Sequence, residues 1–144
     1  MDNIEVLKFE FSDTELFGHS SKIRQIVFCG EQNCPTEEEF DGLDDVSVHY
    51  LLKYNGEYAA TSRKRETADG IKLERFAVLK EYRGKGLASR ILDFVLNDID
   101  DESKLVYLNA QIDAMPLYAK FGFKQLGEMF EEANIMHYRM ELEK

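Results

Sequence analysis

The stretch Val78-Leu79-Lys80-Glu81-Tyr82-Arg83-Gly84-Lys85-Gly86-Leu87-Ala88 leads from an apolar, strand-like segment into an amphipathic, helix-like one. Glycine has no Cβ, so the backbone at Gly84 and Gly86 can approach an anion closely. The first amides of a helix have no partners within it and together carry about half a positive charge. Arg83 and Lys85 add full charges beside them. The stretch predicts a pyrophosphate site that opens a helix, although a loop that uses glycine only to turn would have the same composition.

Two widely used phosphate-binding patterns are absent. The P-loop pattern, G-x-x-x-x-G-K-[ST], does not occur in the chain. The dinucleotide pattern, G-x-G-x-x-G, lacks its third glycine, because Ser89 stands where that glycine would follow Gly84 and Gly86. The predicted anion site therefore belongs to neither of these two classes.

The fold is predicted from the periodicity on either side of this stretch. Leu87, Ile91 and Val95 recur at helical spacing, and the pairs Asn55-Gly56 and Asp69-Gly70 are turn signals between strands. The expected strands cover 4–11, 46–54, 58–64, 71–79, 105–110, 123–126 and 135–142, and the expected helices cover 14–29, 86–99 and 112–121. The order β-α-β-β-β-α-β-α-β-β predicts an α+β fold, a mixed β-sheet flanked by helices.

The N-terminal third is predicted in less detail. In the helix expected over 14–29, the inner face is predicted to hold Leu16, Ile23, Ile26 and Val27. The polar stretch 31–45 contains Pro35 and Gly42 and is expected to be a loop.

Length and composition bound the class of protein. The chain has 144 residues, of which 44% are hydrophobic and 32% charged, and this predicts a single domain over residues 1–144. No apolar run approaches the roughly 20 residues that span a bilayer, so no membrane partner is expected. The acidic N-terminal residues do not resemble a signal peptide. Together these absences predict a cytoplasmic location.

Charge and cysteine content narrow the partners further. The net charge of −10 argues against nucleic acid, because nucleic-acid binding needs a basic surface. Cys29 and Cys34 have no second cysteine pair at zinc-binding spacing. They are interpreted as two reduced thiols, and no metal site is expected.

Several motifs resemble one known superfamily. Residues Arg83 to Ala88 resemble the R-x-x-G-x-G/A element of the GNAT N-acetyltransferases. Residues Glu74 to Val78 resemble the central strand of that superfamily, and Leu117 to Phe123 resemble its L-Y-x-x-x-G-F element. The expected order of strands and helices is also that of the GNAT fold. The resemblance covers nearly the whole chain.

Dispersed residues narrow the resemblance to the ElaA-like branch. They are Ile23-Arg24, Val27-Phe28, Glu31 to Pro35, Asp41-Gly42, Asp44, His49, Ala110-Gln111, Phe130 to Glu132, His137 and Met140. Matches in the same order along the chain are more specific than one glycine motif.

The resemblance implies acetyl-CoA as the acetyl donor. It implies that backbone groups of Ala77 and Val78 pair with the pantetheine arm, and that the amides of Arg83, Gly84, Lys85, Gly86, Leu87 and Ala88 bind the pyrophosphate. Many GNAT members have an asparagine where this chain has Gln111, so Gln111 and its neighbour Asn109 are candidates for a side-chain contact to CoA. Polar residues at strand ends also serve only the fold, and that reading stays open.

The implied reaction is direct attack of an amine on the thioester. The leaving thiolate benefits from a proton, and the resemblance implies that Tyr118 donates it. Glu74 and His137 are candidates for the base, His49 is a further one, and Glu31 is a candidate for lining the acceptor pocket. Each of the four also fits a purely structural role, as does Tyr118. A covalent route through Cys29 or Cys34 has no base placed beside it by the sequence.

The acceptor is expected to be an amine, either a small molecule or a peptide. Two other functions share the sequence features: a CoA-binding sensor without turnover, and a protein-interaction module in which the glycine turn is only structural. The sequence does not predict an oligomeric state.

Overall fold

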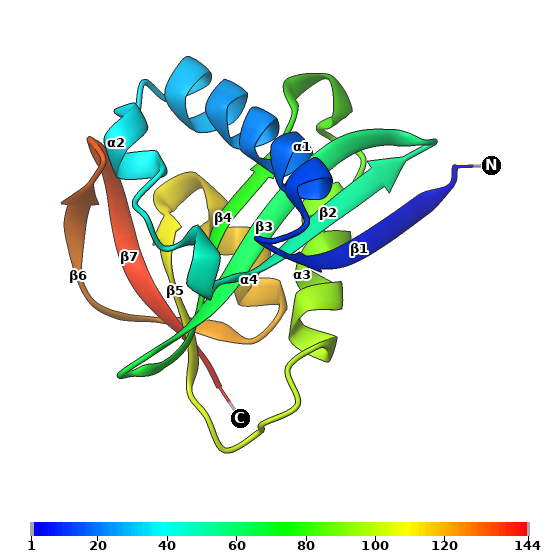
Figure 1. The fold of residues 1–144 in the computed structure, drawn as a ribbon. Coiled ribbons are helices and arrows are strands. Elements are labelled where there is room, and N and C mark those ends of the chain that lie inside the picture. Colours follow the sequence, from blue (N-terminus) through cyan, green and yellow to red (C-terminus); the bar gives the residue numbers. More distant parts are fainter. Residues whose placement is uncertain (1, 144) are drawn as a thin grey trace.

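Seven strands form one sheet in the order β1-β2-β3-β4-β5-β7-β6 in the computed structural model, which describes residues 2–143 (Figure 1). The strands are β1 (Ile4–Glu10), β2 (Val48–Tyr54), β3 (Glu57–Thr67), β4 (Gly70–Val78), β5 (Val106–Gln111), β6 (Phe123–Glu132) and β7 (Ile135–Leu142), and the helices are α1 (Thr14–Arg24), α2 (Thr36–Glu39), α3 (Leu87–Asn97) and α4 (Met115–Lys120). Within the described residues, no helix combines the length and the apolar character needed to cross a membrane.

The sheet is mixed, as predicted. Strands β1 to β4 form an antiparallel meander, β4 and β5 run parallel, and β7 pairs antiparallel with both β5 and β6. A parallel pair needs a crossover connection, which α3 provides. Positive φ at Asn55 (50°) and Gly56 (85°) forms the predicted tight turn between β2 and β3. The α+β fold is confirmed.

Helices cover both faces of the sheet. Tyr50 and Leu52 of β2 lie in the larger apolar core together with Val95 of α3. Leu51, which points to the opposite face, packs with Ile23 of α1 in a second core. Figure 1 likewise shows α1 and α3 on opposite sides of β2 and β3. Full burial of each such side chain contributes about 1.5–3 kcal/mol to the stability of the fold.

The first helix differs from the prediction in its last turns. The helix expected over 14–29 is found as α1 followed without a break by a π-helical segment, Gln25–Glu31. Ile23 and Val27 are buried as expected, but the placement of Ile26 on the inner face is wrong, because its side chain is 43% exposed. A π-helical turn is wider than an α-helical turn, so later residues rotate away from the positions that a 3.6-residue period predicts.

Two further boundaries need correction. The stretch 31–45, expected to be a loop, contains α2 and a 3₁₀ turn, Asp44–Val46. The strand expected over 123–126 continues to Glu132 as β6. Most side chains of β6 are exposed on both faces, so no alternation of apolar and polar residues marks the second half of this strand.

Buried ion pairs fasten the segment around α2 to the sheet. Arg24 and Arg63 are buried, and Arg24 donates to Glu39 Oε2 at 2.7 Å and to Asp44 Oδ1 at 2.8 Å. Arg63 donates to the same oxygen of Asp44 at 2.8 Å and to Glu74 Oε1 at 3.1 Å. Since each charge has partners, the attraction offsets the cost of removing the charges from water. The network holds residues 39–44 against β3 and β4.

Candidate active site

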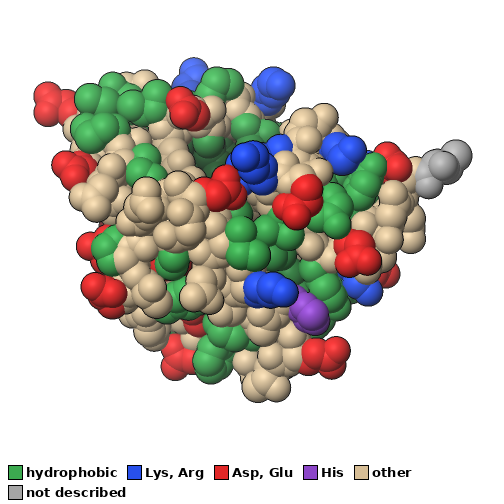
Figure 2. Space-filling view, turned by 90° about the horizontal axis from the view of Figure 1, so that it is seen from above, with side chains coloured by type: hydrophobic (Ala, Val, Ile, Leu, Met, Phe, Trp, Pro, Cys, Tyr) green, Lys and Arg blue, Asp and Glu red, His purple; other side chains and the backbone are tan. Residues whose placement is uncertain are grey.

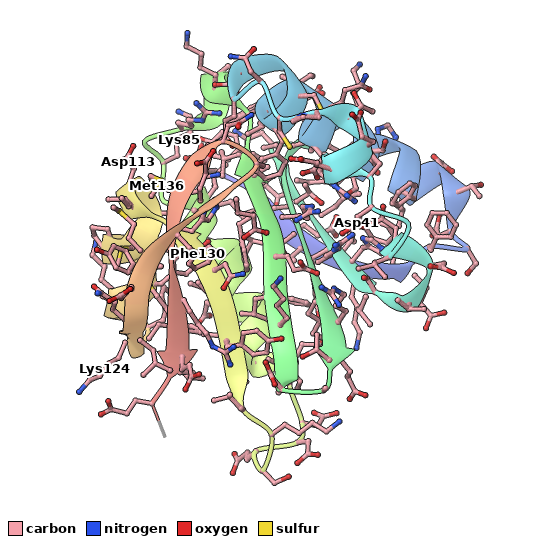
Figure 3. All side chains as sticks on the ribbon, turned by 90° about the vertical axis from the view of Figure 1, so that its left-hand side faces the viewer. Asp41, Lys85, Asp113, Lys124, Phe130 and Met136 are labelled. Atoms are coloured by element: carbon pink, nitrogen blue, oxygen red, sulfur yellow. The ribbon has the colours of Figure 1, made fainter. Side chains whose placement is uncertain are left out.

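Strands β4 and β5 separate near the middle of the sheet. They pair only at Ile71 with Val106, Lys72 with Tyr107 and Leu73 with Leu108. Beyond these pairs β4 continues to Val78 and β5 to Gln111 without contact in register. Figure 3 shows the two strands side by side at one end and apart at the other. The segment with Asp41 lies on one flank of the opening, and Phe130 and Met136 of the β6–β7 hairpin lie on the other.

A bulge in β4 accounts for this separation. Thr61 of β3 lies opposite Ala77, and Arg63 lies opposite Glu74, so β4 has one more residue than β3 in this interval. The bulge contains Arg75, whose φ of 61° is a left-handed conformation that non-glycine residues rarely adopt. A bulge bends its strand and increases the local twist, which turns β4 away from β5.

The separated strands form two walls of a cavity of about 410 Å³. The β6–β7 hairpin, α4 and the segment 28–39 complete its lining. The lining residues that bear acid, base or amide groups and were candidates from sequence are Glu74, Asn109, Gln111, Tyr118 and His137. Five residues from four elements, distant in sequence, are thus brought to one cavity.

The glycine stretch follows β4 after a 3₁₀ turn, Lys80–Tyr82, and presents free amides. Gly84 (φ 80°) and Gly86 (φ 75°) are both left-handed, and a Cβ at either position would meet open space. Gly86 is the N-cap of α3 and no side chain caps the helix. In the described part of the chain, the six amides from Gly84 to Ser89 donate to no backbone or side-chain acceptor. Six unpaired donors beside a helix dipole form an anion-binding concavity.

Of the basic residues of this stretch, Arg83 is already paired with an acidic residue, and Lys85 lies beside an aromatic ring. Arg83 donates from Nε to the Val78 carbonyl oxygen at 2.9 Å, and from Nη1 and Nη2 to the carboxylate of Glu31 at 2.9 and 2.7 Å. Lys85 Nζ lies 5.4 Å from the centre of the Tyr54 ring. Seen from above the view of Figure 1, basic side chains lie singly among acidic and apolar ones (Figure 2). Within residues 2–143, the backbone amides from Gly84 to Ser89 are therefore free donors, whereas the Arg83 guanidinium is engaged.

The end of β4 also offers backbone groups to the opening. The Leu79 amide donates to the Ala59 carbonyl oxygen at 2.9 Å, on the β3 side. Because backbone groups alternate along a strand, those of Ala77 also face β3, whereas those of Phe76 and Val78 face the side that β5 has left. Of the two backbone positions expected to contact a ligand, Val78 is the one on the open side.

Tyr118 of α4 is enclosed by aromatic rings. Its side chain is 7% exposed and packs edge-on against Phe76 and Phe123, at 5.9 and 6.0 Å between ring centres. Within residues 2–143 its hydroxyl has no hydrogen-bond partner, and the residue lines the cavity. Burial raises the pKa of Tyr118 well above its ordinary value of 10.0, so the phenol keeps its proton at neutral pH.

Two base candidates line the cavity, and their surroundings differ. His137 is 7% exposed, and its Nδ1 lies 2.7 Å from the Ile135 carbonyl oxygen. A carbonyl only accepts, so Nδ1 carries the hydrogen and Nε2 of the neutral ring keeps a lone pair. Glu74 instead receives hydrogen bonds from Arg63 and Arg65. Burial acts to raise the pKa of Glu74, but the neighbouring cations outweigh it and lower that pKa.

The remaining candidates have structural partners. His49 is buried away from the cavity, and its Nε2 lies 2.9 Å from the Asp44 carbonyl oxygen. Glu31 pairs with Arg83 and does not line the cavity. Cys34 does line it, but burial raises the pKa of its thiol, which disfavours the nucleophilic thiolate. Cys29 is partly exposed elsewhere.

Both amide candidates are engaged across the cavity. Gln111 Nε2 donates to Gln32 Oε1 at 2.9 Å, and Asn109 Nδ2 donates to Glu132 Oε2 at 3.4 Å. Sequence reasoning did not select Glu132 or Arg75 as lining residues. Glu132 lies in the half of β6 that was not predicted as a strand, and nothing in the local sequence marks Arg75 as a bulge.

The sequence is similar to those of known acetyltransferases. A family model of the acetyltransferase (GNAT) domain matches residues 32–144. The chain is 38% identical over 121 residues to YjcF, an uncharacterized N-acetyltransferase of Bacillus subtilis (strain 168), with 82% of this chain and 86% of YjcF covered. It is 30% identical over 125 residues to ElaA of Escherichia coli (strain K12), with 83% of this chain and 82% of ElaA covered.

Solved structures agree in fold. An acyl-CoA N-acyltransferase from Pseudomonas aeruginosa superposes with a TM-score of 0.88 at 25% identity, covering 98% of this chain and all of the other. The crystal structure of Escherichia coli ElaA superposes with a TM-score of 0.87 at 28% identity, covering 96% of this chain and 99% of ElaA.

Proposed function

The chain belongs to the GNAT acetyltransferase family, in its ElaA-like branch, and is an acyltransferase; from this premise we propose that it transfers an acetyl group from acetyl-CoA to a primary amine. The GNAT fold generally uses acetyl-CoA, and GNAT enzymes take an amine acceptor. The proposal extends to residues 1–144 acting as one catalytic domain. It also places the reaction in the cytoplasm, the expected location of the chain.

The observation that carries the proposal is the row of six amides from Gly84 to Ser89, at the start of α3, that are unpaired within the described residues. A diphosphate needs several donors at once and gains from the positive end of a helix. The row follows β4 after the 3₁₀ turn Lys80–Tyr82, and the Phe76–Val78 end of that strand has no β5 partner. The sequence led us to expect the amides of Arg83 to Ala88 as the pyrophosphate donors. The Arg83 amide already donates to the Lys80 carbonyl oxygen at 3.3 Å, whereas the Ser89 amide is a further free donor among the described residues.

The pantetheine arm would follow the open side of β4. We assign its backbone partners to Phe76 and Val78, with Ala77 supporting the strand through its contact with β3. Asn109 and Gln111 stand across the opening on β5, where their side-chain amides can contact the arm or the acetyl group. The N–H of Phe76 is then the donor nearest the bulge for the charge that develops on the thioester oxygen.

We assign the base to His137. An amine acceptor has an ordinary pKa of about 10.4, so it arrives as an ammonium ion and must lose a proton before it attacks. Nε2 of His137 has a lone pair and no partner among the described residues. Glu74 is the weaker candidate, because its carboxylate is held by Arg63, Arg65 and Lys72.

We assign the acid to Tyr118. The leaving sulfur departs as a thiolate and is stabilised by a proton. The buried phenol of Tyr118 keeps its proton at neutral pH and has no competing acceptor in the described residues. In this proposal, His137 on β7 deprotonates the amine and Tyr118 on α4 protonates the sulfur. Both residues line the same cavity.

The proposal is tested with the purified protein, acetyl-CoA and a library of primary amines, with products identified by mass spectrometry. Thermal unfolding with and without acetyl-CoA measures binding separately, since a ligand at 100 times its Kd stabilises by about 2.7 kcal/mol. We expect both a thermal shift and acetylated products. A shift without any product would support a non-catalytic CoA sensor, and no shift would support an interaction module.

A further inference from the structure

Each lysine and arginine among the described residues that line the cavity already has an acidic partner. Lys72 Nζ lies 3.4 Å from Glu74 Oε2, and Arg75 Nε lies 3.0 Å from Glu39 Oε2. Arg75 also reaches Asp41 Oδ2 at 3.1 Å. These contacts belong to the network that fastens α2 to the sheet. An acceptor with a carboxylate or phosphate group would have to break one of them.

Two acidic side chains of the lining have no cation. Glu132 is half-buried, and its one hydrogen bond comes from the neutral Asn109 amide at 3.4 Å. Glu38 is exposed on α2, and within residues 2–143 neither carboxylate is within ion-pair distance of a lysine or arginine. A partly desolvated carboxylate gains most from a cation supplied by a ligand.

The proposed acid and base, Tyr118 and His137, indicate where in the cavity the reaction takes place. Tyr118 and His137 are each more than nine-tenths buried, and the hydroxyl of one and Nε2 of the other have no partner among the described residues. Glu132 and His137 lie on the two arms of one hairpin, where Glu132 pairs with Ile135 and the intervening turn has positive φ at Ala133 and Asn134. One molecule can therefore reach both positions.

We propose that the acceptor is a small aliphatic diamine or polyamine, whose first amine is acetylated while its second ammonium pairs with Glu132. The inference rests on the proposed function. His137 removes the proton from the first ammonium, and the freed nitrogen attacks the thioester carbonyl carbon. The C–N bond forms, the C–S bond breaks, and the electron pair leaves with sulfur, which takes the proton of Tyr118. The nitrogen, which the attack leaves with a positive charge, loses its second proton to solvent, and the amide results. The Tyr118 phenolate then takes a proton from solvent, and His137 releases its own proton to solvent.

Three acceptors of similar length test the assignment: 1,5-diaminopentane, 1-aminopentane and 5-aminopentanoate. Each is titrated against the purified chain with saturating acetyl-CoA, and the acetylated product is measured by mass spectrometry. We expect kcat/KM for the diamine to exceed that for the monoamine by about tenfold, because a partly buried charge pair is gained. The aminocarboxylate is expected to be the poorest, because Glu132 repels it.

The variant Glu132→Gln keeps the shape and the hydrogen bond from Asn109 but removes the charge. We expect it to lower kcat/KM for the diamine by about tenfold, through KM, and to leave the monoamine within about twofold. Glu131→Gln is the matched control, because Glu131 is the residue next to Glu132, and its side chain is exposed and does not line the cavity. It should change neither acceptor.

The outcomes separate the inference from the function on which it rests. Equal kcat/KM for the diamine and the monoamine, or a diamine preference that survives Glu132→Gln, would overturn the second-cation assignment while acetyl transfer stands. Faster acetylation of a lysine-containing peptide than of the diamine would also overturn it. No product from any acceptor, with acetyl-CoA still bound, would overturn both proposals.

Discussion

Nδ1 of His137 donates a hydrogen bond to the carbonyl oxygen of Ile135, two residues earlier on β7, at 2.7 Å. This contact orients the ring and leaves Nε2 as the only nitrogen that can accept a proton. His49 is held in a similar way, with Nε2 beside the Asp44 carbonyl oxygen and Nδ1 without a partner among the described residues, but it is fully buried and does not line the cavity, so a substrate cannot reach it there.

The first prediction concerns this base. His137→Gln removes the proton acceptor, and we expect kcat to fall by about 10²- to 10⁴-fold, as is typical when a general base is lost. Acetyl-CoA should still bind, because His137 lies on β7 and not in the glycine stretch. Steady-state rates and a thermal shift measure the two effects. A variant with kcat within threefold of the original would remove His137 from the mechanism.

Tyr118→Phe tests the acid. The hydroxyl has no partner in the described residues, so the variant loses no hydrogen bond and keeps the packing against Phe76 and Phe123. We expect the free energy of unfolding to change by less than about 0.5 kcal/mol, whereas kcat should fall by about 10²-fold. Urea denaturation and turnover measured on one preparation decide between this role and a purely structural one, in which kcat would not change.

A pair of glycine variants separates backbone strain from ligand binding. Gly86 (φ 75°) and Gly56 (φ 85°) have similar conformations, and a Cβ at either would meet open space. Alanine at each should therefore cost about 1 kcal/mol of stability. Only Gly86→Ala should also weaken acetyl-CoA binding, by about tenfold, because the added Cβ would occupy space beside the free amides that the diphosphate needs. Isothermal titration measures this difference, and equal affinities in both variants would contradict it.

The buried ion network predicts how stability depends on pH. Burial acts to raise the pKa of Asp44 and of Glu74, but Arg24 and Arg63 with the other nearby cations outweigh it, so both lie below their ordinary 3.8 and 4.5. A carboxyl whose pKa is lowered on folding stabilises the protein above its unfolded pKa and loses that contribution as pH falls. Burial raises the pKa of Glu39, so this residue acts in the opposite sense. We expect a steady free energy of unfolding above about pH 5 and a net fall below pH 4.5.

Removing one cation from the network should be costly at neutral pH. Arg63→Met leaves Asp41, Asp44 and Glu74 without one of their partners, and we expect a loss of about 3–5 kcal/mol at pH 7. The loss should be smaller at pH 4, where these carboxyls begin to take up protons in the variant. Urea denaturation at the two pH values measures it. An equal loss at both would show that the charges do not carry the effect.

The parts of the site that could be predicted from sequence lie in short contiguous motifs. The left-handed backbone at Gly84 and Gly86 could be predicted from the local sequence, because glycine before a helix favours this conformation. Tyr118 likewise belongs to a motif that ends at Phe123, and its position in the cavity follows from where α4 docks. The order of strands and helices along the chain was predicted for the same reason, since turns such as Asn55-Gly56 are local signals.

The rest depends on contacts that are distant in the sequence. Arg75 adopts a positive φ with no local signal, and its side chain is bound by Glu39 and Asp41, more than thirty residues away. The π-helical turns that expose Ile26 and the exposed second half of β6 likewise break the periodicity from which elements are predicted. The preference for His137 over Glu74 came from their hydrogen-bond partners, which composition and spacing do not reveal.

The most direct test of the account is a crystal structure of the chain with coenzyme A. We expect the diphosphate to accept hydrogen bonds from amides between Gly84 and Ser89, and the thiol to lie beside the Tyr118 hydroxyl. A diphosphate bound elsewhere, or a thiol far from Tyr118, would contradict the account.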